Sequence, residues 1–410
     1  MGEEPSGPLV GIRVVELAGL GALPFGTQKL GDLGADIVRV HRREEVPPGP
    51  VAYRYSEYNR GRRSIAVDLK HPDGVAVVKA LTARADAFVE SFRPGVCERL
   101  GLGPDDLMAA NPRLVYGRLT GWGQDGPLAQ RAGHSLNYEA ITGAVGSIGT
   151  RGAKPVPLLQ VLGDFAGGGL HLAYGVVCAL LEAQRSGRGQ VVDVAMVDGV
   201  MSLYSVYYGM ARSGLHREEV GTNFFDGGSP VYNVYETSDH EYVTVAPIEP
   251  QFYAVLLDRL GLDAAALPDR DDPASWDALV GIFAEVFRTR TRAEWEAVFA
   301  ETDACVTPVY SFTEVPSHPA HVARGVFRAL PDGGTELVPT PRFSRTPGRP
   351  RRSYACPGAD TEAVCEELGL DAHALRAAGA VAWPGSDSGS GIDQESGADR
   401  GSGADRVREG

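Results

Sequence analysis

Residues 13–40 decide the fold of this chain, and they read RVVELAGLGALPFGTQKLGDLGADIVRV. Residues 13–17 are an apolar strand pattern followed by glycines, residues 25–33 have a helical pattern that ends at Gly34, and residues 37–40 are a second strand pattern. A strand, a helix and a second strand at this spacing predict a βαβ unit with two parallel strands.

The alternation of strands and helices continues beyond residue 40. Strand patterns occupy residues 64–69, 87–90 and 114–119, and a helical pattern runs from about 73 to 83. We therefore expect an α/β fold, with a Rossmann-like large domain built on a mainly parallel sheet.

Positive charge gathers where ligands of such a sheet bind, beyond the carboxyl ends of the strands. Two clusters fall there, one made of Arg39, His41, Arg42 and Arg43 and the other of Arg60, Arg62 and Arg63. They could hold a phosphorylated ligand by charge-assisted hydrogen bonds, or they could be solvated surface arginines.

The pattern changes in the second half of the chain. A long apolar helix is expected at residues 170–183 and a strand at 191–195, followed by hairpin-like strands at 231–235 and 241–246. Residues 291–294, TRAE, are a capping box that opens a helix. We expect a large domain at 1–200, a linker at 201–224, a smaller α+β domain at 225–315, a return segment at 316–384 and a disordered tail at 385–410, which is rich in Gly, Ser and Asp.

Composition narrows the class of protein. With 410 residues and 43% apolar content, the chain suits an enzyme-sized globular body. No apolar run approaches the roughly 20 residues of a membrane helix, and a net charge of −14 argues against nucleic acid or an anionic membrane as the partner. The five cysteines are scattered without metal or redox spacing, so we expect a cytoplasmic protein without a metal site.

Three separate segments each present a proton-handling side chain beside glycine or proline. They are GHSLNY at 133–138 with His134, GDFAGGG at 163–169 with Asp164, and IEPQFY at 248–253 with Glu249. An imidazole and a carboxylate that face one carbon can remove a proton from one side and return it to the other. Each also has a structural alternative, because a single histidine is often structural and Asp164 and Glu249 could simply cap helices.

Several motifs identify a family resemblance that covers about residues 8–345. The segments 14–17 (VVEL), 31–36 (GDLGAD), 67–70 (VDLK), 92–96 (FRPGV) and 189–196 (GQVVDVAM) resemble the family III CoA-transferase superfamily. Within it, 120–124 (TGWGQ), 132–134 (AGH), 248–253 (IEPQFY) and 302–309 (TDACVTPV) are similar to the α-methylacyl-CoA racemase branch.

The resemblance implies an interlocked homodimer with the acyl group of an acyl-CoA substrate at the subunit interface, and no cofactor beyond the CoA moiety. It assigns His134 and Asp164 as the two bases and Glu249 as support for the histidine. By position, it also assigns the CoA contacts to Arg42, Ala66, Val67, Asp68, Leu69, Glu90, Ser91, Phe92, Arg99, Ala132, Gly133, Ser135, Leu136 and Asn137.

The chain departs from the racemase pattern close to these residues. Ser135 stands where racemases usually have aspartate, Glu139 stands where an apolar residue is usual, and Phe224 and Phe225 replace the more common Met-Leu. Flexible methionines suit varied fatty acyl chains. Their scarcity here suggests a shorter, more polar or more specialised acyl group.

Three functions remain open from the sequence. The first is a racemase or epimerase that inverts the α-carbon of a 2-methylacyl-CoA through an enolate. The second is a family III CoA transferase in which Asp164 is a nucleophile that forms an acyl-enzyme anhydride. The third is a non-catalytic acyl-CoA binder. A transferase has no need of His134 together with Glu249, so these residues favour the racemase.

Overall fold

A seven-stranded sheet is the centre of the molecule. The computed structural model describes residues 5–47, 60–330, 334–349 and 356–385. The strands lie in the order β12-β3-β2-β1-β4-β5-β6. Their bounds are β1 Arg13–Leu17, β2 Asp36–Arg42, β3 Arg62–Val67, β4 Ala87–Glu90, β5 Val115–Thr120, β6 Val191–Ala195 and β12 Val381–Ala382.

The order of the six parallel strands is that of a doubly wound nucleotide-binding sheet, which confirms the predicted α/β fold. Strand β12 is antiparallel to β3 and comes from the far end of the chain. The strand order reverses between β1 and β4, and ligands of such sheets bind in the crevice at that reversal. Gly19 after β1 and Ser91 after β4 meet there, because a Cβ on Gly19 would lie 2.5 Å from Ser91 Oγ.

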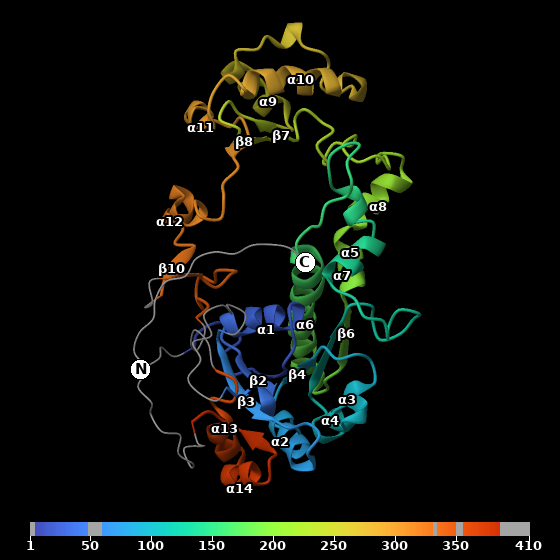
Figure 1. Ribbon diagram of the computed structural model, residues 1–410, viewed down its shortest axis with the longest axis vertical. Helices are drawn as coiled ribbons and strands as arrows, with labels where there is room; N and C mark the ends of the chain where they lie inside the picture. Colours follow the sequence, from blue (N-terminus) through green and yellow to red (C-terminus); the bar gives the residue numbers. More distant parts are fainter. Residues whose placement is uncertain (1–4, 48–59, 331–333, 350–355, 386–410) are drawn as a thin grey trace, which may run out of the picture.

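Helices cover both faces of the sheet (Figure 1). One face packs against α1 and α6, with core residues such as Val14 and Leu172. The other face packs against α2, α3, α4, α13 and α14, with core residues such as Phe88 and Val364. The bounds of these helices are α1 Ala22–Asp32, α2 Pro72–Thr82, α3 Val96–Arg99, α4 Pro104–Ala110, α6 His171–Ser186, α13 Thr361–Leu368 and α14 Ala372–Ala377.

Two helices begin earlier than the sequence pattern predicts. Helix α1 begins at Ala22 and includes Pro24, since a proline in the first turn has no intrahelical hydrogen bond to lose. The apolar helix expected at 170–183 is preceded by the π-helix η4, Val161–Leu170, which contains the three glycines expected to precede it. Close packing of η4 against its neighbours α1 and α7 (Met196–Leu203) overrides the low helix propensity of these glycines.

Helices η4 and α6 together form a 26-residue segment, Val161–Ser186, that is long and apolar enough to cross a membrane by length and composition alone. The expectation that no segment reaches this length is therefore wrong. Side chains such as Ala173, Val176 and Leu180 on one side of α6 are buried against the sheet. On the other side Tyr174, Val177 and Leu181 are exposed.

A second, smaller body lies at the opposite end of the molecule (Figure 1). It contains the antiparallel sheet β7-β8-β9 and the helices α9, α10 and α11 around a core of aromatic side chains that includes Phe283 and Phe287. The bounds are β7 Asn233–Glu236, β8 Tyr242–Val245, α9 Pro250–Leu260, α10 Trp276–Phe287, α11 Arg292–Phe299 and β9 Val306–Pro308. The predicted capping box at Thr291 and Glu294 is present at the start of α11.

Two connections on opposite sides of the molecule join the bodies (Figure 1). The outgoing connection contains α5 Ser135–Ile141, α7 and α8 Ser205–Arg212. The return connection contains α12 Pro319–Ala323 and the hairpin β10 Phe327–Ala329 and β11 Thr335–Leu337. After Gly385, the predicted disordered tail lies outside the described residues.

Candidate active site

His134 caps the N-terminus of α5 at the rim of a small pocket. Its backbone N–H donates to Asn137 Oδ1 at 3.0 Å, which holds the first turn of the helix. The pocket has a volume of about 290 Å³, and Ser91, Phe92 and Arg93 line it together with His134. The exposed histidine therefore stands beside the loop after β4, where the sheet topology places a ligand.

Asp164 lies in the first turn of η4 and is half-buried. Its backbone N–H donates to Ser135 Oγ at 3.1 Å, so the residue that follows His134 touches the backbone of Asp164. The carboxylate faces the start of α1, because a Cβ on Gly21 would lie 2.6 Å from Asp164 Oδ2. The structure thus brings the predicted base pair together from two segments 30 residues apart in sequence.

The surroundings of Asp164 favour its protonated form. Burial raises the pKa of the carboxyl above its ordinary value, and the negative charge of Glu139 raises it further. His134 and the nearby Ser135 hydroxyl act in the opposite direction. A carboxyl with a raised pKa can donate a proton as well as accept one, which a two-base site requires.

Glu249 stands apart from this pair. It is the exposed N-cap of α9 in the smaller body, at the opposite end of Figure 1 from the sheet. Among the described residues no hydrogen bond or ion pair joins Glu249 to His134 or Asp164. A direct role beside the histidine requires Glu249 of a second copy of the chain.

The residues expected to contact CoA lie mostly at the carboxyl edge of the sheet. Arg42 ends β2 and is exposed, and its β3 neighbour is Val67. Ala66 and Val67 are fully buried and pair with β12, so only Asp68 and Leu69 of this segment are accessible.

The remaining expected CoA contacts surround the small pocket or the end of β4. Glu90 is buried, accepts from the Phe92 N–H at 2.6 Å and pairs with Arg118 at 3.2 Å, so it shapes the loop that carries Ser91. Ala132 and Gly133 line the pocket with His134, and Leu136 and Asn137 are exposed on α5. Arg99 lies at the end of α3.

The second arginine cluster is structural, which neither of its two proposed explanations anticipated. Arg62 pairs with Glu16 at 2.8 Å, and both side chains are buried. Arg60 pairs with Asp32 at 2.6 Å and donates to the Leu337 carbonyl on the return connection. These guanidinium groups bind carboxylates inside the protein, as does Arg39 of the first cluster, whose Nη1 lies 3.4 Å from Glu16 Oε1.

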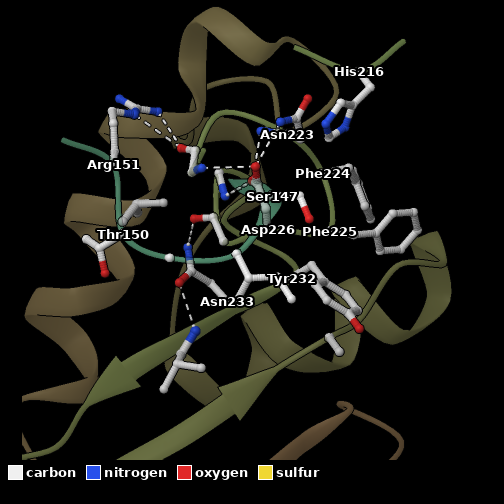
Figure 2. Close-up of a pocket in the computed structure, with 18 of the residues that line it drawn as sticks. Ser147, Thr150, Arg151, His216, Asn223, Phe224, Phe225, Asp226, Tyr232 and Asn233 are labelled. Atoms are coloured by element: carbon white, nitrogen blue, oxygen red, sulfur yellow. Dashed lines mark hydrogen bonds between the residues drawn. The ribbon is translucent and has the colours of Figure 1, made fainter. Parts of the chain in front are cut away.

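A second, larger cavity was not anticipated from the sequence. It has a volume of about 990 Å³ and lies where residues 147–151 and α8 meet the smaller body (Figure 2). Phe224, Phe225 and Tyr232 form an aromatic wall, with ring centroids 4.9 Å apart for the two phenylalanines and 5.0 Å for Phe225 and Tyr232. The wall contains both residues that depart from the racemase Met-Leu pattern.

The loop that carries this wall is held by Asp226. Its carboxylate accepts from the backbone N–H groups of Gly221, Asn223 and Gly228 at 2.9, 2.8 and 3.2 Å (Figure 2). The pocket is lined by residues from five stretches of the chain, 147–151, 204–210, 216–234, 244–246 and 277–280. The sequence signal that could have found it is the aspartate-glycine-glycine turn directly after two aromatic residues.

Comparison with known proteins places the chain among CoA-dependent enzymes. A sequence profile described as CoA-transferase family III matches residues 9–361. The chain is 46% identical over 367 residues to an α-methylacyl-CoA racemase of Mus musculus, with 88% of this chain and 93% of the mouse protein covered. It is 43% identical over 363 residues to the α-methylacyl-CoA racemase of Homo sapiens, with 88% and 94% covered.

A solved structure has the same architecture. The crystal structure of a CAIB/BAIF family protein from Brucella suis superposes with a TM-score of 0.76 at 27% sequence identity. The match covers 88% of this chain and 100% of the Brucella chain. The overall fold is therefore shared with a solved relative.

Proposed function

The chain belongs to CoA-transferase family III, and from that premise we propose that it is an α-methylacyl-CoA racemase, an isomerase that inverts the α-carbon of a 2-methylacyl-CoA thioester. One structural observation carries the chemistry. His134 lines a pocket at the sheet edge where a CoA thioester would bind, and the hydroxyl of the next residue, Ser135, accepts from the Asp164 N–H.

The mechanism follows from two proton carriers that face one carbon. The thioester acidifies the α-proton, and one base removes it to form an enolate. The other base, already protonated, delivers a proton to the opposite face. The two groups interact electrostatically, so the site titrates with apparent pKa values of the pair. The raised pKa of Asp164 suits it to hold the proton that it delivers.

We propose that CoA lies along the carboxyl edge of the sheet. Exposed Arg42 at the end of β2 would meet its phosphates, and Asp68 and Leu69 beyond β3 would lie beside it. The loop after β4, with Ser91 and Phe92, would carry the thioester to His134. A chain with a net charge of −14 has to gather positive charge locally to hold phosphates, and Arg42 provides it.

We also propose a cytoplasmic homodimer whose chains are threaded through each other. Its support is the arrangement of two bodies joined by connections on opposite sides (Figure 1). The exposed apolar row of Tyr174, Val177 and Leu181 on α6 offers a surface for a second copy. In such a dimer, Glu249 and the aromatic wall of one copy would meet His134 of the other.

The proposed function is tested with a 2-methylacyl-CoA in heavy water. The parent protein should incorporate deuterium at the α-carbon as optical activity is lost. His134→Ala and Asp164→Ala should each abolish racemisation, and each should retain exchange from only one stereoisomer, with opposite isomers in the two variants. If Asp164→Ala stops all turnover, His134→Ala leaves it near normal and CoA moves between acyl acceptors, the protein is a transferase.

A further inference from the structure

A carboxylate is buried directly behind Asp164. The side chain of Glu139 in α5 has no solvent exposure. Its Oε1 accepts from the Ser135 hydroxyl at 2.7 Å and from the Gly163 N–H at 2.8 Å. Its Oε2 is buried and has no hydrogen-bond partner among the described residues. Burial of a carboxylate oxygen without a partner is costly, so stability alone does not explain this residue.

Glu139 reaches Asp164 through one hydroxyl. The Ser135 hydroxyl donates to Glu139, and Ser135 Oγ accepts from the Asp164 N–H at 3.1 Å. The first turn of η4 is therefore tied to α5 at two successive residues, Gly163 and Asp164. A Cβ on Gly163 would lie 2.4 Å from Ser135 Oγ and 2.9 Å from Glu139 Oε1, so only glycine admits the serine and glutamate pair beneath the helix.

We propose that Glu139 is a positioning residue for Asp164, which fixes the Asp164 backbone through Ser135 and places a second carboxylate behind the first turn of η4. The inference rests on the proposed function, in which Asp164 transfers a proton. Glu139 acts on Asp164 in two ways. Hydrogen bonds connect it to the Asp164 backbone, and its carboxylate places a like charge in a buried environment near the Asp164 carboxyl.

Electrostatics agrees with this geometry. After burial, the charge of Glu139 is the largest influence that raises the pKa of Asp164. His134 opposes it, and Asp164 in turn raises the pKa of Tyr138 after burial. Other ionisable side chains lie on the elements packed against η4, and they are Lys29 and Asp32 on α1, His171, Tyr174, Cys178, Glu182 and Arg185 on α6, Asp198 on α7, Tyr116 and Arg118 on β5 and Asp193 on β6. Of these, only Glu182 is changed in the variants below, as a control.

The test is the pH dependence of α-proton exchange from the isomer that Asp164 deprotonates. Asp164 must be ionised to accept that proton, so exchange falls on the acidic side of its pKa. Glu139→Gln removes the like charge, and the acidic limb should move to lower pH by about one unit. Ser135→Ala removes a hydroxyl that lowers the Asp164 pKa, so its limb should move to higher pH. If the two substitutions only loosened η4, both variants would exchange the α-proton more slowly, and their acidic limbs would not shift in opposite directions.

A matched control is present on α6. Glu182 accepts from the Ser186 hydroxyl at 3.1 Å, four residues away, as Glu139 does from Ser135, but Glu182 is exposed and outside the site. Glu182→Gln should leave the pH profile in place. A folded Glu139→Gln protein whose acidic limb matches the parent would overturn the inference, and if that variant does not fold, a Ser135→Ala limb that stays in place or moves to lower pH would do so.

A readout independent of turnover separates this inference from the proposed function. Carbon-13 NMR titration of the aspartate carboxyls reports the Asp164 pKa directly, with the resonance assigned by its loss in Asp164→Asn. A lower Asp164 pKa in Glu139→Gln supports the coupling even if the parent shows no exchange with 2-methylacyl-CoA. An unchanged titration in an active parent rejects the coupling and leaves the racemase function standing.

Discussion

Replacement of Gly199 by alanine should disable the site from a distance. Gly199 in α7 packs on η4, and a Cβ there would lie 1.9 Å from the Gly167 carbonyl oxygen. A carbon and an oxygen in contact need about 3.3 Å, so α7 and η4 would have to separate by about 1.4 Å. Overpacking of this kind costs about 1–3 kcal/mol of stability. A misplacement of about 1 Å costs roughly 10²-fold in rate, and Asp164 is three residues from Gly167 in the same helix.

The assay for Gly199→Ala is racemisation kcat/KM together with thermal unfolding. The matched control is Gly281→Ala in α10, an exposed helical glycine whose Cβ would meet nothing within 4 Å. That control should gain about 0.5–1 kcal/mol, as alanine does over glycine within a helix, and keep its rate. A Gly199→Ala protein with parental rate and melting temperature would refute the argument that this contact positions Asp164.

Three further predictions concern charge. Asp32→Ala removes the two-bond carboxylate partner of Arg60, which is 2% exposed, and leaves Glu336 at 3.5 Å, so urea unfolding should show a loss at the lower end of about 3–5 kcal/mol. Burial raises the pKa of Glu16, but Arg62 and Arg39 outweigh it and bring the pKa below its ordinary value of 4.5. The stability that Glu16 contributes is therefore present above about pH 4.5 and lost as pH falls through the lower folded pKa, and Glu16→Gln should flatten this acidic fall in the free energy of unfolding. Arg42→Ala should raise KM for the acyl-CoA and weaken its salt dependence with little change in kcat, and an unchanged KM with a reduced kcat would contradict a phosphate contact.

The parallel sheet could be predicted because each of its strands can be recognised from a short stretch of sequence. Each strand is a short apolar run, each is followed by a helix-length segment, and right-handed connections leave few arrangements. The buried pairs of Arg62 with Glu16 and Arg60 with Asp32 could not be predicted, because their partners are 46 and 28 residues away. An arginine in a charge cluster looks the same whether its partner is a phosphate or an internal carboxylate.

The two bases show the same difference between local features, which the sequence predicts, and long-range contacts, which it does not. The motifs predicted His134 and Asp164 as a pair of bases, and the structure adds that the hydroxyl of Ser135, next to His134, accepts from the Asp164 N–H. The departures at Ser135 and Glu139 were visible in the sequence as changes close to the bases, without a contact between them. The fold brings α5 against η4 and so makes these residues one hydrogen-bonded unit. The sequence does not show this contact, because Gly163 and Glu139 are 24 residues apart.

Strand β12 has a consequence for biosynthesis. Val381 and Ala382 pair with Val67 and Ala66, and they leave the ribosome roughly 190 residues after strand β6. At ~5–20 residues per second this is a delay of about 10 to 40 s. During that time the edge of β3 has no strand to cover it, and an open edge invites pairing with other chains. A nascent chain arrested before residue 381 should therefore depend on chaperones in a way that the finished protein does not.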